Sequence, residues 1–355
     1  MRIWWRGNDF EERQAALVEK DVLDRIDLCW TGAMGLGLMD LLRGECLIHL
    51  HLMMALDAGE PRRVVRALAG RVWILANQGD KEWENVYKRA MALAKPLRHE
   101  DAVARTKLLG GLANLLWGRW EGAIRMCLEA EESLQKHQIE GIAERHLAVF
   151  SAMRAQLYRG ELRYAAELMI PLRRQLDESN NHLFNLNTAA GVSAFLRMAE
   201  DEPEQGMREV LKAVELWSHE GFHQQHAYAL VARVALELYS GRAQTAWEIQ
   251  DSQWSVARKS LSQVGIVMAG EMFLWRGRTA LALAQAGVRE ASMLKEARTM
   301  AGQARKRGPH WMAPMARLLE VGIEAVEGGN GIDEELKEVV AELEAHDLGL
   351  LAAIA

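Results

Sequence analysis

Five consecutive residues past the middle of the chain, His219-Glu220-Gly221-Phe222-His223, spell the pattern H-E-x-x-H. On a continuous helix this spacing places two imidazoles on one face for zinc, with the glutamate as general base. Gly221 at the centre opposes that arrangement, because glycine weakens a helix interior and is favoured just past a helix end. We therefore predict that one helix runs over 203–219, that Gly221 is left-handed, and that the next helix runs over about 223–240.

A zinc hydrolase would also need a third ligand, and Glu237, near the end of a largely apolar segment, is the candidate that follows. We expect a packing or capping role for the five residues instead. Two alternatives stay open at this point: zinc hydrolysis, and adventitious metal binding through His223 and His226. If Gly221 ends a helix, Phe222 should pack back on the apolar face that carries Trp217.

Other residues of chemically active types have simpler interpretations. His49 and His51 stand two apart, so on a helix they point in directions that cannot share a metal, and one of them should be a hydrogen-bonded core or interface histidine. The acidic pairs Glu131-Glu132 and Glu334-Glu335 fall on faces that should be solvated. The patterns of a P-loop, a His-Arg-Asp catalytic loop and an Asp-Phe-Gly segment are absent from the sequence.

Tryptophan is unusually common, with 12 Trp against 5 Tyr and 6 Phe. Since few basic residues are interleaved with them, base stacking is not favoured. We expect wedges between repeats, with the indole N–H bonded to a turn carbonyl. They are Trp30, Trp73, Trp117, Trp120, Trp217, Trp247, Trp254, Trp275 and Trp311. The segment GAMGLGLMD at 32–40 should allow close packing of helices in a soluble core.

Composition excludes several classes of protein. Half of the 355 residues are hydrophobic and the net charge is −6, so neither nucleic acid nor an anionic membrane is attracted by overall charge. The basic run 305–307 is typical of a solvated helix end. Three separated cysteines, Cys29, Cys46 and Cys127, indicate reduced, buried thiols and a cytoplasmic location. We expect no signal peptide and no membrane span.

Helical signals recur with a period of about 40 residues. Four apolar helix ends are followed by a turn residue, Gly118, Gly160, Asp201 or Gly241, and five residues later by a small residue. The small residues are Ala123, Ala165, Gly206 and Ala246. The first residue of each pair should turn the chain between two antiparallel helices, and the second should let them approach closely. A fixed period in a helical chain predicts a solenoid.

The Gly-x-x-x-x-Ala centres resemble tetratricopeptide-type repeats, and Gly118-Arg119-Trp120 followed by Ala123 and Ala130 matches them best. The stretches 24–69, 217–241 and 310–325 resemble the C-terminal helical region of large bacterial eukaryotic-like serine/threonine kinases that also carry a predicted ATPase. The kinase and ATPase parts of that family have no counterpart in this chain. The resemblance implies a helical signalling region and assigns no catalytic residue.

These observations predict an all-α fold: an N-terminal segment over 1–20, then one tetratricopeptide-like superhelix over 21–355 made of about eight antiparallel helix pairs. The predicted pairs are 21–42 with 44–57, 61–78 with 82–96, 101–117 with 119–136, 139–159 with 161–178, 182–199 with 203–219, 222–240 with 242–259, 262–284 with 288–307, and 310–327 with 332–346. Pro171 should kink or break its helix. The apolar tail 348–355 should cap the last repeat or begin a further helix.

Solenoids of helix pairs present a concave surface to peptides and proteins. We therefore expect a non-enzymatic scaffold of a bacterial signalling protein that binds a protein or peptide partner in its groove, with homo-oligomers possible. The sequence predicts no catalytic, cofactor-binding or metal residues, no cofactor, and no nucleic acid or membrane partner. The alternative is a small-molecule sensor domain of a signalling ATPase. Zinc hydrolysis is less favoured than either of these two functions.

Overall fold

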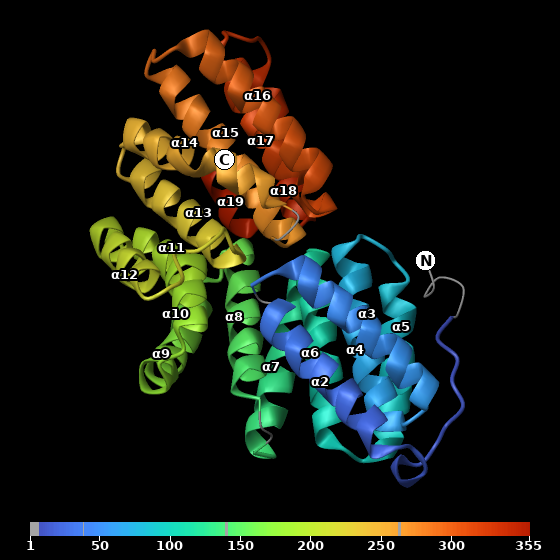
Figure 1. The fold of residues 1–355 in the computed structure, drawn as a ribbon. Helices are drawn as coiled ribbons and strands as arrows, with labels where there is room; N and C mark the ends of the chain where they lie inside the picture. The colour runs from blue at the N-terminus through green and yellow to red at the C-terminus, as the bar shows by residue number, and fades with distance from the viewer. Residues whose placement is uncertain (1–6, 38, 139–140, 262–263) are drawn as a thin grey trace. The chain divides into compact units, whose positions relative to one another are not determined.

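The computed structural model describes residues 7–37, 39–138, 141–261 and 264–355, and within these ranges it is helical with no strand. Successive helices pair into antiparallel hairpins (Figure 1). The first four hairpins are α2 (Lys20–Gly37) with α3 (Leu41–Ala58), α4 (Pro61–Asn77) with α5 (Trp83–Ala94), α6 (Glu100–Leu116) with α7 (Trp120–Lys136), and α8 (Ile142–Arg159) with α9 (Leu162–Ser179).

The fifth hairpin begins with a composite helix, α10 (His182–Thr188), the π-helix η3 (Ala189–Ser193) and α11 (Ala194–Ala199), which pairs with α12 (Pro203–Glu215). The last three are α13 (Gln224–Tyr239) with α14 (Ala243–Lys259), α15 (Ile266–Gln285) with α16 (Glu290–Arg307), and α17 (Ala313–Val326) with α18 (Ile332–Ala345). Short 3-10 turns, η1 (Ala15–Leu17), η2 (Lys95–Leu97) and η5 (His310–Met312), and the helix α19 (Gly349–Ile354) complete the chain. The all-α class and the hairpin organisation are confirmed.

The turn residues of the 40-residue pattern adopt the conformation that the sequence predicts. Gly118, Gly160 and Gly241 have φ of 68°, 81° and 72°, and Asp201 reaches 58°. This left-handed conformation ends one helix and reverses the chain, and a residue with a Cβ adopts it only at a cost.

The small residues five positions later are buried at helix contacts. Ala123, Ala165 and Ala246 have no exposed surface. A Cβ added to Gly206 would lie 3.0 Å from a methyl carbon of Leu236, so that contact needs glycine. The repeat register derived from the sequence is therefore confirmed at these four turns.

The contacts divide the chain into two compact units, 1–152 and 153–355, with the boundary inside α8. Unit 1 contains the hairpins from α2 to α7 and is closely packed where its helices carry glycine. A Cβ on Gly44 would lie 2.4 Å from the Cα of Gly37, which explains the glycine-rich sequence at the α2–α3 junction. Whether the two units form one continuous solenoid, as predicted for 21–355, stays a prediction.

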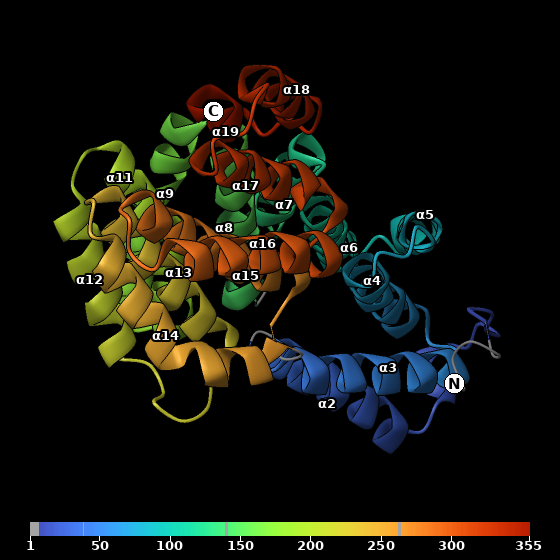
Figure 2. The same cartoon turned by 90° about the horizontal axis from the view of Figure 1, so that it is seen from above.

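Unit 2 places α13, α15 and α17 side by side, with α16 covering α15 and α17 (Figure 2). Its C-terminal segment lies against α18 and against the end of α8. There Arg159 pairs with Asp347 at 3.0 Å, and the backbone at Leu350 approaches Gly160. The tail therefore contacts the first helix of the unit as well as the last hairpin.

Helix α9 continues through Pro171 without a break, and the alternative of a kink there stays a prediction. Two local expectations are corrected. Cys46 is exposed rather than buried, because it lies on the outward face of α3. Glu131 is largely buried and accepts two hydrogen bonds from Arg145, so it is not a solvated carboxylate. None of the helices in the described ranges is long and apolar enough to span a membrane.

Candidate functional site

The H-E-x-x-H residues form a turn between two helices. Helix α12 already ends at Glu215, Gly221 has φ of 73°, and α13 begins at Gln224. The predicted helix break is confirmed, although α12 ends four residues before the predicted position 219. His219 and His223 consequently do not lie one turn apart on a single helix.

The side chain of His226 makes two hydrogen bonds to backbone groups of this turn. Its Nδ1 accepts the backbone N–H of His223 at 2.9 Å, so its Nε2 carries the hydrogen and donates to the carbonyl of Ser218 at 2.9 Å. Burial lowers the pKa of His226, which favours this neutral form. Nδ1 therefore caps the start of α13, and Nε2 bonds the turn that follows α12, so both nitrogens are engaged. Phe222 is buried and stacks on His226; its predicted packing on Trp217 stays a prediction.

Within the described ranges, no group of three or more His, Cys, Asp or Glu side chains could hold a metal ion. His49 and His51 diverge on α3 as predicted. His49 Nδ1 lies 2.8 Å from the carbonyl of Glu45. His51, in contrast, is fully buried and neither ring nitrogen makes a hydrogen bond, so it is His49 that matches the expectation of one hydrogen-bonded histidine in this pair.

The surroundings of His51 keep it neutral. Its ring lies 5.4 Å from that of Trp30, and the guanidinium of Arg66 on α4 lies over the Trp30 ring, 5.4 Å from the ring centroid. Burial first, and then the positive charge of Arg66, lower the pKa of His51 to about 3. The unfolded chain accepts a proton near pH 6.5 and the folded chain does not, so stability falls as the pH drops below about 6.5.

The tryptophans act mainly as packing groups, as predicted. Trp117 donates its indole N–H to the carbonyl of Ala76 at the end of α4, at 3.2 Å. The indole N–H of Trp217, however, has no hydrogen-bond partner. In unit 2 the guanidinium of Arg276 lies between two rings, 4.2 Å from that of Trp247 and 4.6 Å from that of Trp254.

A buried ion pair joins α8 to α15 within unit 2. Arg154 donates to Glu271 at 2.5 Å, to the hydroxyl of Tyr158 at 2.8 Å and to the carbonyl of Gly191 in η3 at 3.1 Å. Tyr158 also donates to Glu271. Each of the two charged side chains is about 5 % exposed. Glu271 holds the pKa of Arg154 above its usual value against the effect of burial. We interpret this cluster as a structural contact that holds α8 against α15.

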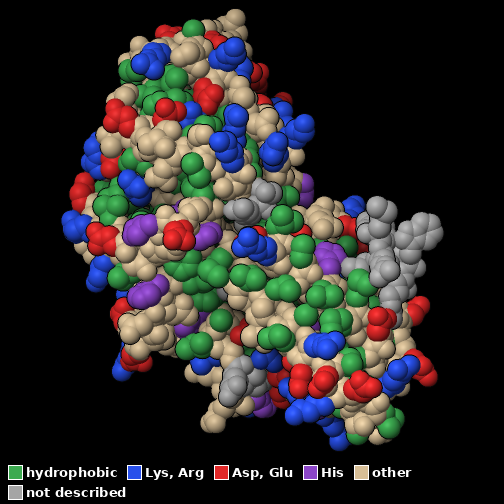
Figure 3. Space-filling view, in the orientation of Figure 1, with side chains coloured by type: hydrophobic (Ala, Val, Ile, Leu, Met, Phe, Trp, Pro, Cys, Tyr) green, Lys and Arg blue, Asp and Glu red, His purple; other side chains and the backbone are tan. Residues whose placement is uncertain are grey.

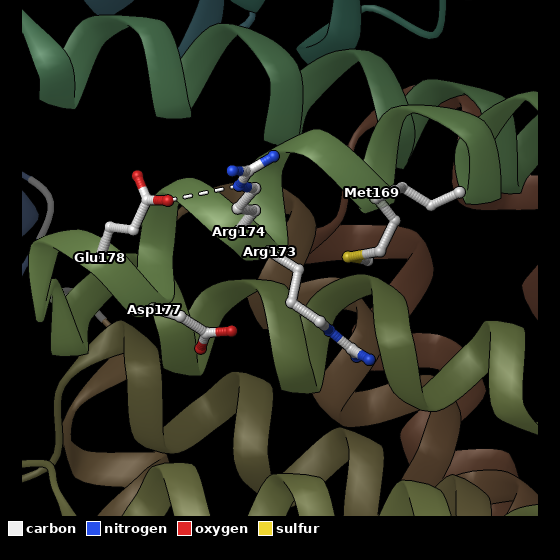
Figure 4. A pocket seen from close by; sticks show the side chains of 6 residues that line it. Met169, Arg173, Arg174, Asp177 and Glu178 are labelled. Carbon is white, nitrogen blue, oxygen red and sulfur yellow. Dashed lines mark hydrogen bonds and ion pairs between the residues drawn. The ribbon is translucent and has the colours of Figure 1, made fainter.

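A hollow of about 170 Å³ lies between α9, the α10–η3 segment and α12. Leu176, Ala213 and Leu216 give it apolar walls, and Thr188 and Asp177 are among its polar lining residues. Figure 4 shows α9, where Arg173 and Asp177 extend from a different side of the helix than the ion-paired Arg174 and Glu178. A second hollow, of about 500 Å³, is lined by α9 alone.

Beside the first hollow, both carboxylate oxygens of Glu209 accept hydrogen bonds from several side chains. Its Oε2 accepts from Arg173 at 2.8 Å and from Ser193 at 2.6 Å, and its Oε1 accepts from Arg197 at 3.0 Å and from Gln205 at 3.1 Å. These donors hold the pKa of Glu209 below its usual value although burial raises it. This carboxylate is an anchor for α9 and η3 and has no free acceptor for a ligand.

The outward face of the first hairpin is apolar. Leu28, Leu42 and Leu50 expose 72 %, 54 % and 46 % of their surface. The middle of the face turned away from the buried side of α2 and α3 carries apolar and small polar residues, and charged residues such as Asp24, Arg25, Arg43 and Asp57 are exposed around it. It consists of Leu28, Thr31, Gly32 and Gly35 on α2 and of Leu42, Cys46, His49, Leu50 and Met53 on α3, and we call it the α2–α3 face. Figure 3 shows hydrophobic side chains gathered over this part of the surface.

Sequence reasoning missed the surfaces and clusters that the fold assembles. Arg154 and Glu271 are 117 positions apart, and no local pattern relates them. The α2–α3 face had a partial signal in the small residues at 32–37, which we interpreted only as internal packing. No protein-family model matches the chain, and no curated protein matches it significantly.

Proposed function

We propose that the chain is a non-enzymatic helical-repeat module of a signalling protein, which docks an amphipathic helix of a protein partner on the α2–α3 face. The observation that supports the proposal is the row Leu42, Cys46 and Leu50, spaced four residues apart along the exposed side of α3. Such spacing forms a continuous stripe on one helix face. A contiguous exposed apolar patch marks an interaction site in many soluble proteins.

The occupant follows from how solenoids are built. Each hairpin of a solenoid buries its faces against neighbouring helices, so an apolar hairpin face is suited to packing against a further helix. The α2–α3 face has an apolar middle with charged residues at its edges, and Gly35, which has no atom within 4 Å of the position of an added Cβ, leaves room for a helix to approach. An amphipathic helix with apolar residues at i, i+3, i+4 and i+7 fits a two-helix surface of this kind.

The concave groove predicted from the sequence stays a prediction. In unit 2 the inner helices α8 and α15 are joined directly by Arg154 and Glu271, so side chains of the protein itself occupy the space between them there. The α2–α3 face is therefore the better supported location for a partner.

Cys46 allows a direct test, because its thiol is exposed at the centre of the α2–α3 face while Cys127 is buried. Cys46 is labelled with a benzophenone maleimide in the full chain, and photolysis is carried out in the native extract. A control protein carries Cys46→Ser and Ile170→Cys, because Ile170 is equally apolar and is exposed on α9.

The proposal predicts one protein crosslinked from position 46 and not from position 170. The crosslinked segment should be an amphipathic helix, and the same protein, once purified, should bind the unlabelled chain. Crosslinks that are the same from both positions, or that map to a segment without an apolar stripe, would exclude docking at this face.

Small-molecule sensing is the second candidate function, and the hollow between α9 and α12 favours it. Zinc hydrolysis receives no support from the turn at 216–223, where both ring nitrogens of His226 are engaged with backbone groups of the turn.

A further inference from the structure

The side chain of Thr188 has a free hydroxyl inside the hollow between α9 and α12. It is 4 % exposed, and its Oγ1 has no hydrogen-bond partner in the structure. Two other buried threonines behave differently. Thr106 donates to the carbonyl of Ala102 at 2.7 Å, and Thr279 donates to that of Trp275 at 2.8 Å. A buried hydroxyl without a partner costs free energy, which a ligand atom at hydrogen-bond distance would recover.

The helix changes its type at this residue. Thr188 ends α10, and the π-helix η3 begins at Ala189, which also lines the hollow. π-Helical turns are rare and frequently lie at functional sites. Two hydrogen bonds hold the π-helical turn in place: Arg154 donates to the carbonyl of Gly191, and Ser193 donates to Glu209. The floor of the hollow is therefore fixed by contacts on two sides.

The charges that line the hollow are balanced, and two of them are unpaired. Arg173 and Glu209 neutralise each other at 2.8 Å. Asp177 on α9 and Lys212 on α12 line the rim of the same hollow, where both are exposed to solvent, and neither forms an ion pair or a hydrogen bond with the described residues. The hollow thus offers one free carboxylate and one free ammonium beside the Thr188 hydroxyl.

We propose that this hollow binds a free aliphatic α-amino acid. A zwitterion pairs with a carboxylate and an ammonium at the same time and adds no net charge. The volume of about 170 Å³ is close to that of a cavity which holds a benzene-sized molecule, so a ligand of about six to ten non-hydrogen atoms fits. The inference gives the sensing alternative a ligand class and does not depend on docking at the α2–α3 face.

Each part of the ligand has a counterpart in the lining. Lys212 and the Thr188 hydroxyl donate to the α-carboxylate, and Asp177 accepts from the α-ammonium. The aliphatic side chain lies against Leu176 and Leu216. A ligand held this way bridges α9 and α12, which meet at the hollow.

Calorimetric titration of the full chain with leucine, valine, 3-methylbutylamine and 4-methylpentanoate tests the proposal. The amine and the acid keep the aliphatic part of leucine but carry only one of its charges. We expect saturable binding of an aliphatic amino acid, and at least tenfold weaker binding of both single-charge analogues. Thr188→Val and Lys212→Met should each weaken binding of the amino acid at least tenfold.

Two matched substitutions separate loss of the site from loss of the fold. Thr279→Val makes the same change at a threonine outside the hollow, and Lys259→Met does so at an exposed lysine at the end of α14. Both should leave binding unchanged, and circular dichroism should show all variants folded. Absence of saturable binding up to 10 mM, equal binding of the amine or the acid, or binding that survives both Thr188→Val and Lys212→Met would each overturn the proposal.

Discussion

Removal of one partner of the buried pair between Arg154 and Glu271 should destabilise unit 2 strongly. Arg154→Met leaves the Glu271 carboxylate about 5 % exposed and with Tyr158 as its remaining donor, while Glu271→Leu leaves the Arg154 cation with Gly191 and Tyr158. Breaking a buried pair in this way costs about 3–5 kcal/mol. The double variant removes both charges. Its loss in free energy of unfolding should therefore be smaller than the sum of the two single losses, by about 2 kcal/mol or more.

Guanidinium unfolding followed by circular dichroism measures all four proteins of this double-mutant cycle. Arg305→Met is the matched control, because Arg305 and its partner Glu320 are 50 % and 30 % exposed. A pair at the surface should contribute about 1 kcal/mol or less. If both single substitutions at the buried pair cost as little as the control, or if their effects simply add, the pair does not join α8 to α15 and the description of unit 2 is wrong.

Four further substitutions test a helix contact, the turn at Gly221 and the buried imidazole of His51. Ala123→Leu should overpack the α6–α7 contact and cost about 1–3 kcal/mol, and an unchanged denaturation midpoint would contradict the repeat register. Gly221→Ala should cost about 1 kcal/mol or more because of its positive φ, whereas Glu220→Gln should leave stability unchanged; peptide hydrolysis that is lost in Glu220→Gln would contradict the turn assignment. Because His51 stays neutral in the folded chain, the unmodified protein should lose about 2 kcal/mol of unfolding free energy between pH 7 and pH 5, and His51→Leu should abolish this loss. Unfolding at each pH measures it, and an undiminished pH dependence in His51→Leu would refute the burial of a neutral imidazole.

The fold class and the repeat register could be predicted because their causes are local in sequence. A glycine or aspartate that reverses the chain, and an alanine five residues later at the helix crossing, act on neighbouring residues. The same holds for Gly221, where a preference for positive φ outweighs a metal-binding pattern. At Pro171 the local signal left a kink and a break as alternatives, and the helix continues through this residue without a break.

The candidate sites could not be predicted, because they depend on how hairpins stack. The ion pair between Arg154 and Glu271 forms only when α8 packs against α15. The free hydroxyl of Thr188 depends on a change from α-helix to π-helix, which has no periodic signature in the sequence. The exposure of Cys46 follows from which side of α3 meets α4, and hydrophobic surroundings in the sequence do not reveal that side.

The affinity of the partner for substituted forms of the chain tests docking at the α2–α3 face most directly. The partner identified by crosslinking from Cys46 is titrated against the unmodified chain, Leu50→Asp and Ile170→Asp. A buried carboxylate in an apolar contact is costly, so Leu50→Asp should raise the Kd at least a hundredfold. Ile170→Asp, at an exposed residue outside that face, should leave the Kd unchanged. Equal affinities for all three proteins would contradict the proposed function.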